Sequence, residues 1–422
     1  MSDGNNGAGS NGKLKVVRII SRLNVGGPAR QACFLHEQLA HCSESVLVAG
    51  KLDPGEADMS YLLPPGNHVV QVDALRRSIR PWTDIRAFWN ILTVLRRERP
   101  HIVHTHCSKA GTLGRIAAAL LRVPVRIHTY HGNVFHGHFG PFTSRLFIEI
   151  EHLLGALTTR VVAISKSQAE ELSGKYKIVG SEKVTLIPNG YDLGPFFSAD
   201  GNRAIRWQCG IDDAKFLVTW AGRLAPIKNI NLLAEIVRAG GANPELHFMI
   251  VGDGTERMRL EHLTRGCPNV TFLGWRAEMP AVWASADVAL LTSRNEGTPT
   301  TLIEAMATGK PFVSTNVGGI SDLAIPPLRN GFSPGVFQAG NGFLTPSSAP
   351  GIIACLEMLA RDRALAARMG REGQRFVRGR FRAERLLRDI ENLYLEVAAE
   401  AGIHCERPAP AGDDSSSRRR SV

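Results

Sequence analysis

The 422-residue sequence lacks long hydrophobic runs. No apolar stretch reaches the roughly 18–20 residues that a membrane-spanning helix requires. Hydrophobic residues make up 44% of the chain and charged residues 21%, as is ordinary for a globular protein. This composition excludes a collagen, a long disordered chain and a polytopic membrane protein. The length predicts two domains, or about three at most.

Cysteine is also sparse. The seven cysteines are irregularly spaced and include no CxxC pair. Zinc ribbons and disulfide frameworks are therefore disfavoured, and reduced cysteines in a cytoplasmic compartment are expected. The first residues, MSDGNNGAGSNGK, contain neither the basic region nor the apolar region of a secretory signal peptide. We therefore expect a cytoplasmic protein.

Acidic residues are outnumbered, with 39 Asp and Glu against 50 Lys and Arg, a formal net charge of +11. Residues 1–200 hold 23 basic and 16 acidic side chains, whereas residues 201–422 hold 27 and 23. The more basic N-terminal half suggests an anionic partner: a nucleic acid, a membrane surface or a phosphorylated substrate. Ordinary solvated arginines explain the charge equally well. Nucleic-acid binding is disfavoured, because no RRM, helix-turn-helix or zinc pattern occurs.

Short apolar runs alternate with amphipathic segments, which predicts an α/β protein with doubly wound parallel sheets. The expected strands form two series. The first comprises 15–20, 44–49, 102–106, 125–129, 161–164 and 184–187, and the second comprises 216–221, 247–251, 270–273, 288–292 and 311–315. Expected helices include 30–39, 85–97, 230–239, 302–307 and a final one at 383–399.

Each series suffices for one Rossmann-like domain, and a Gly-, Pro- and Asn-rich stretch near 190–210 separates them. Two such domains facing each other create a cleft at the C-terminal ends of their strands, where open α/β sheets bind ligands. The expected division is a disordered tail at 1–13, Rossmann-like domains at 14–200 and 201–380, a helix at 381–400 that returns toward the first domain, and a disordered tail at 401–422.

The most informative stretch, SRNEGTPTTLIEAMATGKPFVSTNVGGISD, follows an expected strand. Glu296 lies in the loop after that strand, and Glu304 falls about one turn into the next helix. Thr298 is expected to cap this helix, with Pro299 as its first residue. Free backbone N–H groups at the helix start would bind an anion, while the two carboxylates accept hydrogen bonds from sugar or ribose hydroxyls. A surface Glu304 that merely pairs with an arginine is the disfavoured alternative.

Two further loops combine glycine with positive charge or close backbone approach. In WAGRLAPIKN, a strand ends at Gly222 and then presents Arg223 and Lys228, and two cations at a strand exit suit a diphosphate. This spacing alone is common in basic loops, so its weight depends on the neighbouring glutamates. Between the first strand and helix, Gly26 and Gly27 let the backbone approach a ligand closely.

Six histidines gather between two expected strands and the following loop. They are His104, His106, His128, His131, His136 and His138. His131 follows a strand and should point into the cleft, whereas His104 and His128 are expected in the core. Their spacing does not fit zinc, no HEXXH motif occurs, and the glycines after the first strand do not follow the GxGxxG pattern. A metal site and a dinucleotide dehydrogenase are therefore disfavoured, and a serine hydrolase is not expected either.

In their order along the chain, these motifs resemble the retaining glycosyltransferases of family four, which have the GT-B fold. The matching pieces are GGPAR at 26–30, HTHCSKAGTLGR at 104–115, HTYHG at 128–132, AISKS at 163–167, IPNGYD at 187–192, AGRLAPIKN at 221–229, VGDG at 251–254 and EGTPTTLIEAMATGKP at 296–311. The last contains the E-x7-E pair of the family as Glu296 and Glu304. Asp322 stands where many members have Glu. The resemblance covers roughly residues 15–400 and favours bacterial capsule, exopolysaccharide or O-antigen enzymes.

The resemblance implies a role for each domain and for individual residues. The first domain would face the acceptor and the second would bind the nucleotide-sugar. Arg223 and Lys228 would hold the diphosphate, and His131 would lie near the anomeric carbon or C6 of the sugar. Glu304 would accept the ribose hydroxyls, and Glu296 those of the transferred sugar. The other binding residues implied are Gly26, Gly27, Gly222, Gly297, Thr300, Thr301 and Leu302.

The implied reaction moves a hexose or N-acetylhexosamine to a hydroxyl of a saccharide, on a lipid carrier, with retention and with neither metal nor cofactor. UDP-sugar is the first expectation for the donor and GDP-mannose the second. Two cations and a helix N-terminus would stabilise the leaving diphosphate, and the bond would break with oxocarbenium character. Glu296 as a covalent nucleophile is one alternative. A sugar-nucleotide epimerase and a non-catalytic GT-B-like binding subunit are others.

Residues 75–99 indicate how the acceptor side could meet a membrane. They contain seven arginines, two acidic residues and the aromatic residues Trp82, Phe88 and Trp89. Basic residues beside aromatic ones suit an anionic lipid surface, which predicts peripheral contact with the inner face of the plasma membrane. The alternative is a packed helix with a solvated arginine face. The aromatic loop at 133–142 would border a lipid-linked acceptor.

Overall fold

The computed structural model describes residues 12–405, apart from 25, 54–55, 57, 65–68, 77, 133–140, 200, 202, 332 and the side chains at 141–144. Most of both predicted tails, His136, His138 and nearly all of the loop at 133–142 lie outside the described residues. Among the helices of the described part, none combines the length and the apolar character needed to cross a membrane.

The first half of the chain forms a parallel sheet of seven strands in the order β3-β2-β1-β4-β5-β6-β7. Its strands are β1 (Leu14–Ile20), β2 (Ser43–Gly50), β3 (Val69–Val72), β4 (Ile102–His106), β5 (Val125–Tyr130), β6 (Arg160–Ala163) and β7 (Val184–Leu186). All residues of β4 are buried, because helices cover both faces of the sheet. The strand order reverses beside β1, which is where such sheets bind ligands.

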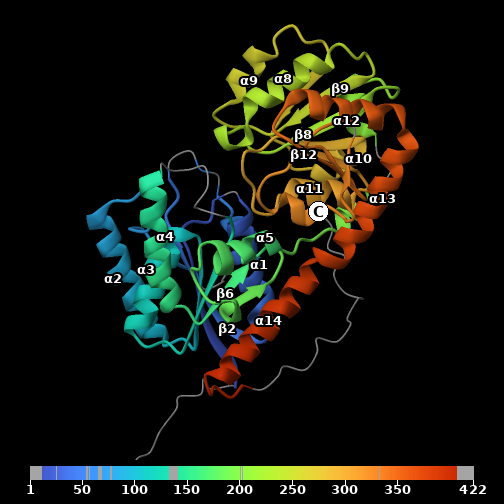
Figure 1. The fold of residues 1–422 in the computed structure, drawn as a ribbon. Helices are drawn as coiled ribbons and strands as arrows, with labels where there is room; N and C mark the ends of the chain where they lie inside the picture. The colour runs from blue at the N-terminus through green and yellow to red at the C-terminus, as the bar shows by residue number, and fades with distance from the viewer. Residues whose placement is uncertain are drawn as a thin grey trace, which may run out of the picture.

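Helices lie on both faces of this first sheet (Figure 1). They are α1 (Gly27–Gln38), α2 (Pro81–Glu98), α3 (Ser108–Leu120), α4 (Pro141–Ala156) and α5 (Lys166–Glu170). Apolar residues of α2 and α3 pack with alternate residues of β1, such as Val17 and Ile19, whereas Leu35 of α1 packs with Leu14 and Val16. Successive residues of a strand point to opposite faces, so β1 contributes to both cores.

The second half contains a sheet of eight strands in the order β10-β9-β8-β11-β12-β15-β14-β13. They are β8 (Phe216–Ala221), β9 (Leu246–Val251), β10 (Val270–Gly274), β11 (Val288–Leu291), β12 (Phe312–Thr315), β13 (Arg329–Asn330), β14 (Phe337–Ala339) and β15 (Gly342–Thr345). The surrounding helices are α6 (Gly194–Phe197), α7 (Ala204–Gln208), α8 (Ile230–Gly240), α9 (Arg257–Leu263), α10 (Met279–Ser285), α11 (Thr300–Ala307), α12 (Ala349–Arg361) and α13 (Arg363–Arg380).

The prediction of a doubly wound α/β fold with two sheets is confirmed. The eleven predicted strands are all present, and their ends differ from the prediction by one residue at most. The strands β3, β13, β14 and β15 were not predicted. β14 and β15 form a short antiparallel hairpin around Gly340 and Asn341, whose length gives little periodicity to read. β7 ends at Leu186 and β8 begins at Phe216, and the domain boundary at 200/201 stays a prediction.

The last helix, α14 (Ala383–Glu400), leaves the second half and runs along the first sheet (Figure 1). Its buried face includes Ile390 and Leu393, which pack with Leu14 and Ile102 of the first sheet. The next residues also pack there through Ile403 and Cys405. The ordered chain therefore extends past 401, where the sequence predicted a disordered tail. The reason is that Ile403 and Cys405 cover the same apolar surface as α14.

Shortening Ile390 to alanine should destabilise the protein by about 2–5 kcal/mol, because a fully buried side chain would leave a cavity between α14 and the first sheet. Urea unfolding of the full chain measures this change. The exposed neighbour Asn392 offers a matched control, and Asn392→Ala should stay within about 0.5 kcal/mol of the wild type. Equal stability of the two variants would contradict the packing of α14.

Candidate active site

A cleft of about 300 Å³ lies between the two halves, at the C-terminal ends of their parallel strands. Loops from both halves line it. The first half contributes Cys107, Ser108, His128, Thr129, Tyr130, His131 and Gly132, and the second contributes Asn295, Glu296 and Gly297. Two predicted catalytic residues, His131 and Glu296, therefore share one cavity although they come from different sheets.

Lys228 and Glu296 form an ion pair at this edge of the second sheet. The Nζ–Oε1 distance is 2.5 Å, and the hydroxyl of Ser293 donates a hydrogen bond of 2.6 Å to the same carboxylate oxygen. Both charged side chains are partly buried, with 18% and 14% of their areas exposed. Because the pair is shielded from water, its geometry is fixed more firmly than that of a surface ion pair. Ser293 was not predicted as a site residue.

The loops of the two halves touch at Gly297. A Cβ atom at this position would lie 2.8 Å from the carbonyl oxygen of His131, so only glycine fits without displacing the backbone. A second link joins the halves nearby, where the backbone N–H of Ser167 donates to the carboxylate of Asp322 at 3.1 Å. Gly297 and Asp322 thus help to set the distance between Glu296 and His131.

His131 is held by a second histidine. Its Nε2 lies 2.9 Å from Nδ1 of His106, and the two rings are stacked. Burial lowers the pKa of His131 to about 4 and lowers the pKa of His106 well below its ordinary value. Both rings are therefore neutral near pH 7, and one of them donates the shared hydrogen bond. This contact assigns His106 a positioning role, because it fixes the tautomer and orientation of His131.

Of the other histidines in the cluster, the two that the structure describes, His104 and His128, belong to the core as predicted. His104 contacts the hydroxyls of Tyr394 at 2.6 Å and Thr129 at 2.7 Å, and His128 contacts the hydroxyl of Thr105 at 2.8 Å. The sequence signal for His106 was its spacing. Alternation along β4 places His104 and His106 on one face of the sheet, where their rings stack.

Glu304 lies on α11 and has an unusual environment. Burial raises the pKa of its carboxyl to about 7, while the Arg30 guanidinium and the Trp283 indole oppose this shift. Nearby, the Thr300 hydroxyl donates to the Tyr191 hydroxyl at 3.0 Å, and the charge of Glu304 contributes to the raised pKa of Tyr191. Arg30 and Tyr191 therefore belong to the site. Both residues belong to motifs noted in the sequence, GGPAR and IPNGYD, but the sequence predicted no role for either.

The start of α11 differs from the prediction. The helix begins at Thr300 with Pro299 at the N-cap and no side-chain cap, so the proposed capping by Thr298 is wrong. Pro299 has no N–H, and the N–H of Leu302 donates to the Pro299 carbonyl at 3.2 Å. The amides of Thr300 and Thr301 remain without an acceptor among the described residues. These two amides are open to a ligand, whereas the predicted Leu302 amide already has a partner within the helix.

Gly222 and Arg223 lie in the loop that follows β8. Arg223 is exposed and forms no ion pair within the described part of the chain. The N–H of Gly222 donates to the Val251 carbonyl at 2.9 Å, and the Thr301 hydroxyl donates to the Ala221 carbonyl at 3.1 Å. These bonds hold the loop after β8 against the end of β9, and the start of α11 against the end of β8.

Gly26 and Gly27 lie apart from the Lys228–Glu296 centre. Gly26 occupies the N-cap of α1, and Gly27 lines a second cavity of about 230 Å³ together with Arg30, Asn189 and Tyr191. A Cβ atom at Gly27 would meet no other atom within 4 Å, so this backbone faces open space. Arg30 lines this second cavity, and its charge also acts on Glu304.

The raised pKa of Glu304 predicts a pH-dependent stability. A carboxyl whose folded pKa exceeds its unfolded value stabilises the fold fully below pH ~4, and this contribution is lost as the pH rises through 7. The free energy of unfolding of the wild type, relative to Glu304→Gln, should fall by on the order of 2 kcal/mol between pH 4.5 and 7.5. Urea unfolding at several pH values measures the difference, and parallel curves would contradict it.

Two family descriptions match the chain. "Glycosyl transferase 4-like domain" matches residues 26–190, and "Glycosyl transferases group 1" matches residues 215–361. Solved structures share the fold. Anabaena HepE in complex with UDP has a TM-score of 0.72 at 19% identity, covering 91% of this chain and 100% of its own. Sucrose-phosphate synthase from Thermosynechococcus elongatus has a TM-score of 0.74 at 21% identity, covering 92% and 100%.

Bacterial glycosyltransferases are similar to it in sequence. A UDP-Gal:alpha-D-GlcNAc-diphosphoundecaprenol alpha-1,3-galactosyltransferase from Escherichia coli is 33% identical over 59% of this chain and 66% of its own length. A GDP-mannose-dependent alpha-mannosyltransferase from Mycobacterium tuberculosis is 30% identical over 68% and 74%. The capsular polysaccharide glycosyltransferase CapM from Staphylococcus aureus is 24% identical over 78% and 85%. The chain therefore belongs to the group 1 glycosyltransferases of family four, with the GT-B fold.

Proposed function

We propose that this protein transfers a hexosyl or N-acetylhexosaminyl group from a nucleotide-sugar to a saccharide hydroxyl, with retention of configuration and without a metal. The observation that carries this proposal is the placement of the Lys228–Glu296 pair opposite His131 across one cleft. A cation, a carboxylate and a neutral hydrogen-bonding ring around a cavity suit a sugar whose bond to a diphosphate is breaking.

The positive charges at the second sheet stand in for a metal in this proposal. Among the described residues Arg223 forms no ion pair and Lys228 pairs with one carboxylate, while the amides of Thr300 and Thr301 lie at the N-terminus of α11. Together they would stabilise the charge that develops on a leaving diphosphate. When a diphosphate draws Lys228 toward itself, Glu296 gains a free oxygen for a sugar hydroxyl. Glu304 lies deeper beside Tyr191 and would accept the ribose hydroxyls.

The bond-breaking step proceeds in this proposal with oxocarbenium character at the anomeric carbon. The acceptor hydroxyl attacks from the face that the diphosphate leaves, and a phosphate oxygen takes its proton. His131, neutral and oriented by His106, hydrogen-bonds the sugar without adding a charge beside the oxocarbenium centre. A cationic His131 would oppose that developing positive charge, so the depressed pKa favours the reaction.

UDP-sugar is the proposed donor and GDP-mannose the second choice. The names of the Escherichia coli and Mycobacterium tuberculosis relatives specify these two donors for those enzymes. A saccharide on a lipid carrier is the proposed acceptor, in the synthesis of a cell-surface polysaccharide.

Acceptor-dependent release of nucleoside diphosphate separates transfer from epimerisation. A non-catalytic binding subunit would bind nucleotides in a thermal-shift screen yet release none.

Replacing Arg223 with alanine should lower kcat by roughly 30- to 150-fold, equal to about 2–3 kcal/mol, because the leaving diphosphate loses one cation. The measurement is diphosphate release from UDP- and GDP-sugars with a lipid-linked saccharide acceptor. Arg259→Ala is the control, since Arg259 is an exposed arginine of α9 paired only with Glu256 among the described residues. Unchanged turnover in Arg223→Ala would remove this residue from the mechanism.

We also propose that the outer face of α2 binds anionic lipid. The inner face of the helix packs on the first sheet through residues such as Ile91 and Leu95, as the alternative of a packed helix requires. The outer face presents Trp82 and Trp89, with 84% and 56% of their areas exposed, beside exposed Arg86. Aromatic rings beside cations suit the headgroup region of a negatively charged bilayer. This contact would bring the acceptor-side half to a lipid-linked substrate.

Replacing Trp82 and Trp89 together with serine should reduce binding to anionic liposomes by about tenfold or more at low salt, because the apolar contact is lost. Flotation of the full chain with vesicles measures binding. Trp207→Ser provides a matched control, since Trp207 is 73% exposed on α7 in the second half. A wild type that fails to float at low salt would overturn the proposal.

A further inference from the structure

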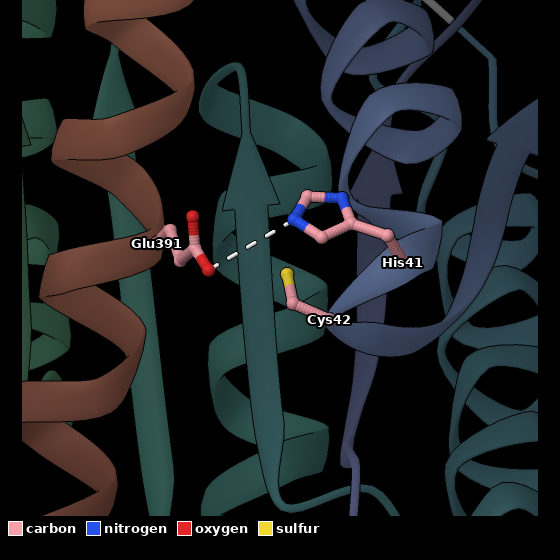
Figure 2. A group of neighbouring side chains, drawn as sticks. All are labelled: His41, Cys42 and Glu391. Atoms are coloured by element: carbon pink, nitrogen blue, oxygen red, sulfur yellow. Dashed lines mark ion pairs between the residues drawn. The ribbon is translucent and has the colours of Figure 1, made fainter. Parts of the chain in front are cut away.

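Three side chains with different metal-binding atoms meet behind the first sheet, away from the cleft (Figure 2). His41 ends the short helix η1 (Leu39–His41), Cys42 directly precedes β2, and Glu391 comes from α14. Because Cys42 lies at the start of a parallel strand, the group sits at the edge opposite the active site. Their nitrogen, sulfur and oxygen atoms all lie within 4.8 Å of one another.

The ring of His41 is oriented as in a metal ligand. Its Nδ1 lies 2.8 Å from the Gln38 carbonyl oxygen, which can only accept a hydrogen bond, so Nδ1 carries the proton. Nε2 then presents its lone pair toward Glu391, whose Oε1 lies 3.9 Å away (Figure 2). Metal-binding histidines commonly donate their second ring N–H to a backbone carbonyl in this way.

The thiol of Cys42 is the third member of the group. The surrounding protein disfavours its ionised form, the thiolate. Burial and the charge of Glu391 raise its pKa to about 11, although the buried Arg18 guanidinium opposes them. An ionised Cys42 thiol and the Glu391 carboxylate repel each other. A divalent cation between them would remove this repulsion and favour loss of the thiol proton.

We propose that His41, Cys42 and Glu391 form a binding site for a zinc-like divalent cation. Nitrogen, thiolate sulfur and carboxylate oxygen are the ligand types that zinc prefers. On binding, the Cys42 thiol releases its proton to solvent and its sulfur bonds to the metal, while water fills the fourth position. The site closes by small movements of His41 and Glu391, which keep 46% and 24% of their side-chain areas exposed.

The site would fasten α14 to the first half of the protein. His41 and Cys42 belong to the connection between α1 and β2, whereas Glu391 lies on the helix that returns from the second half. A metal bound here cross-links segments about 350 residues apart in sequence, which stabilises the folded state by mass action. It lies outside the cleft, so the proposed reaction stays metal-independent.

Cobalt(II) tests the proposal on the full chain, because a cobalt–thiolate bond gives an ultraviolet charge-transfer absorption. The wild type should develop this band at one equivalent of metal, and Cys42→Ser should abolish it. Cys209→Ser is the matched control, since Cys209 is another half-buried free cysteine, and it should retain the band. Glu391→Gln, which preserves the shape of a helix surface residue, should weaken cobalt affinity by at least about tenfold.

Thermal unfolding with zinc provides a second readout that does not depend on activity. Zinc should raise the Tm of the wild type and of Cys209→Ser, and leave the Tm of Cys42→Ser and Glu391→Gln nearly unchanged. Absence of a charge-transfer band in the wild type, or a band that persists in Cys42→Ser, would overturn the site. A band lost in Cys42→Ser with unchanged affinity in Glu391→Gln would overturn the role of Glu391, and with it the fastening of α14.

Discussion

The ion pair between Lys228 and Glu296 depends on the pairing of two strands in the second sheet. Lys228 follows β8 and Glu296 follows β11, and these strands are parallel neighbours whose residues pair from Val288–Val218 to Leu290–Trp220. Parallel pairing brings both C-terminal ends to one edge, so the charges meet although they are 68 positions apart in sequence. An antiparallel β11 would place Glu296 at the opposite edge. The site is therefore a consequence of sheet direction.

The two halves are held together in two places, at the cleft and where α14 packs on the first sheet. These contacts restrict the width of the cleft and so the ligands that it can contain. At the cleft, the loop of Gly297 touches the loop of His131, and Asp322 accepts a hydrogen bond from Ser167. Behind the first sheet, α14 contributes Ile390 and Leu393 to the apolar core. A helix that belongs to one half by sequence and to the other by packing limits how far the halves can separate.

Much of the fold and of the site could be predicted from the sequence, because the informative signals are local. Buried parallel strands are continuous apolar runs, and the glutamates eight positions apart lie on one strand–loop–helix unit. The contributions of Arg30 and Tyr191 could not be predicted in the same way. Arg30 acts on Glu304 from the other half of the chain, and no spacing encodes that distance.

The error at the start of α11 has a physical explanation. A threonine before a proline satisfies the usual cap pattern, yet Pro299 takes an extended conformation and itself becomes the cap residue. Thr298 is thereby turned away and reaches the Ile164 carbonyl at 3.5 Å. The local pattern correctly predicted the start of a helix, but the helix begins one residue later than predicted. The shift determines which amides face the cleft.

Electrostatics divides the site into two parts with different requirements for a ligand. Around Lys228 and Glu296, opposite charges already neutralise each other, so an incoming anion must compete with a carboxylate. Around Glu304, burial leaves a carboxyl only half ionised at pH 7, although Arg30 lies near enough to oppose the shift. A ligand that offers hydroxyls to Glu304 and phosphates to Lys228 would improve both environments at once. A nucleoside diphosphate, part of the donor proposed above, has these groups at its two ends, which would favour it over a free sugar or a free phosphate.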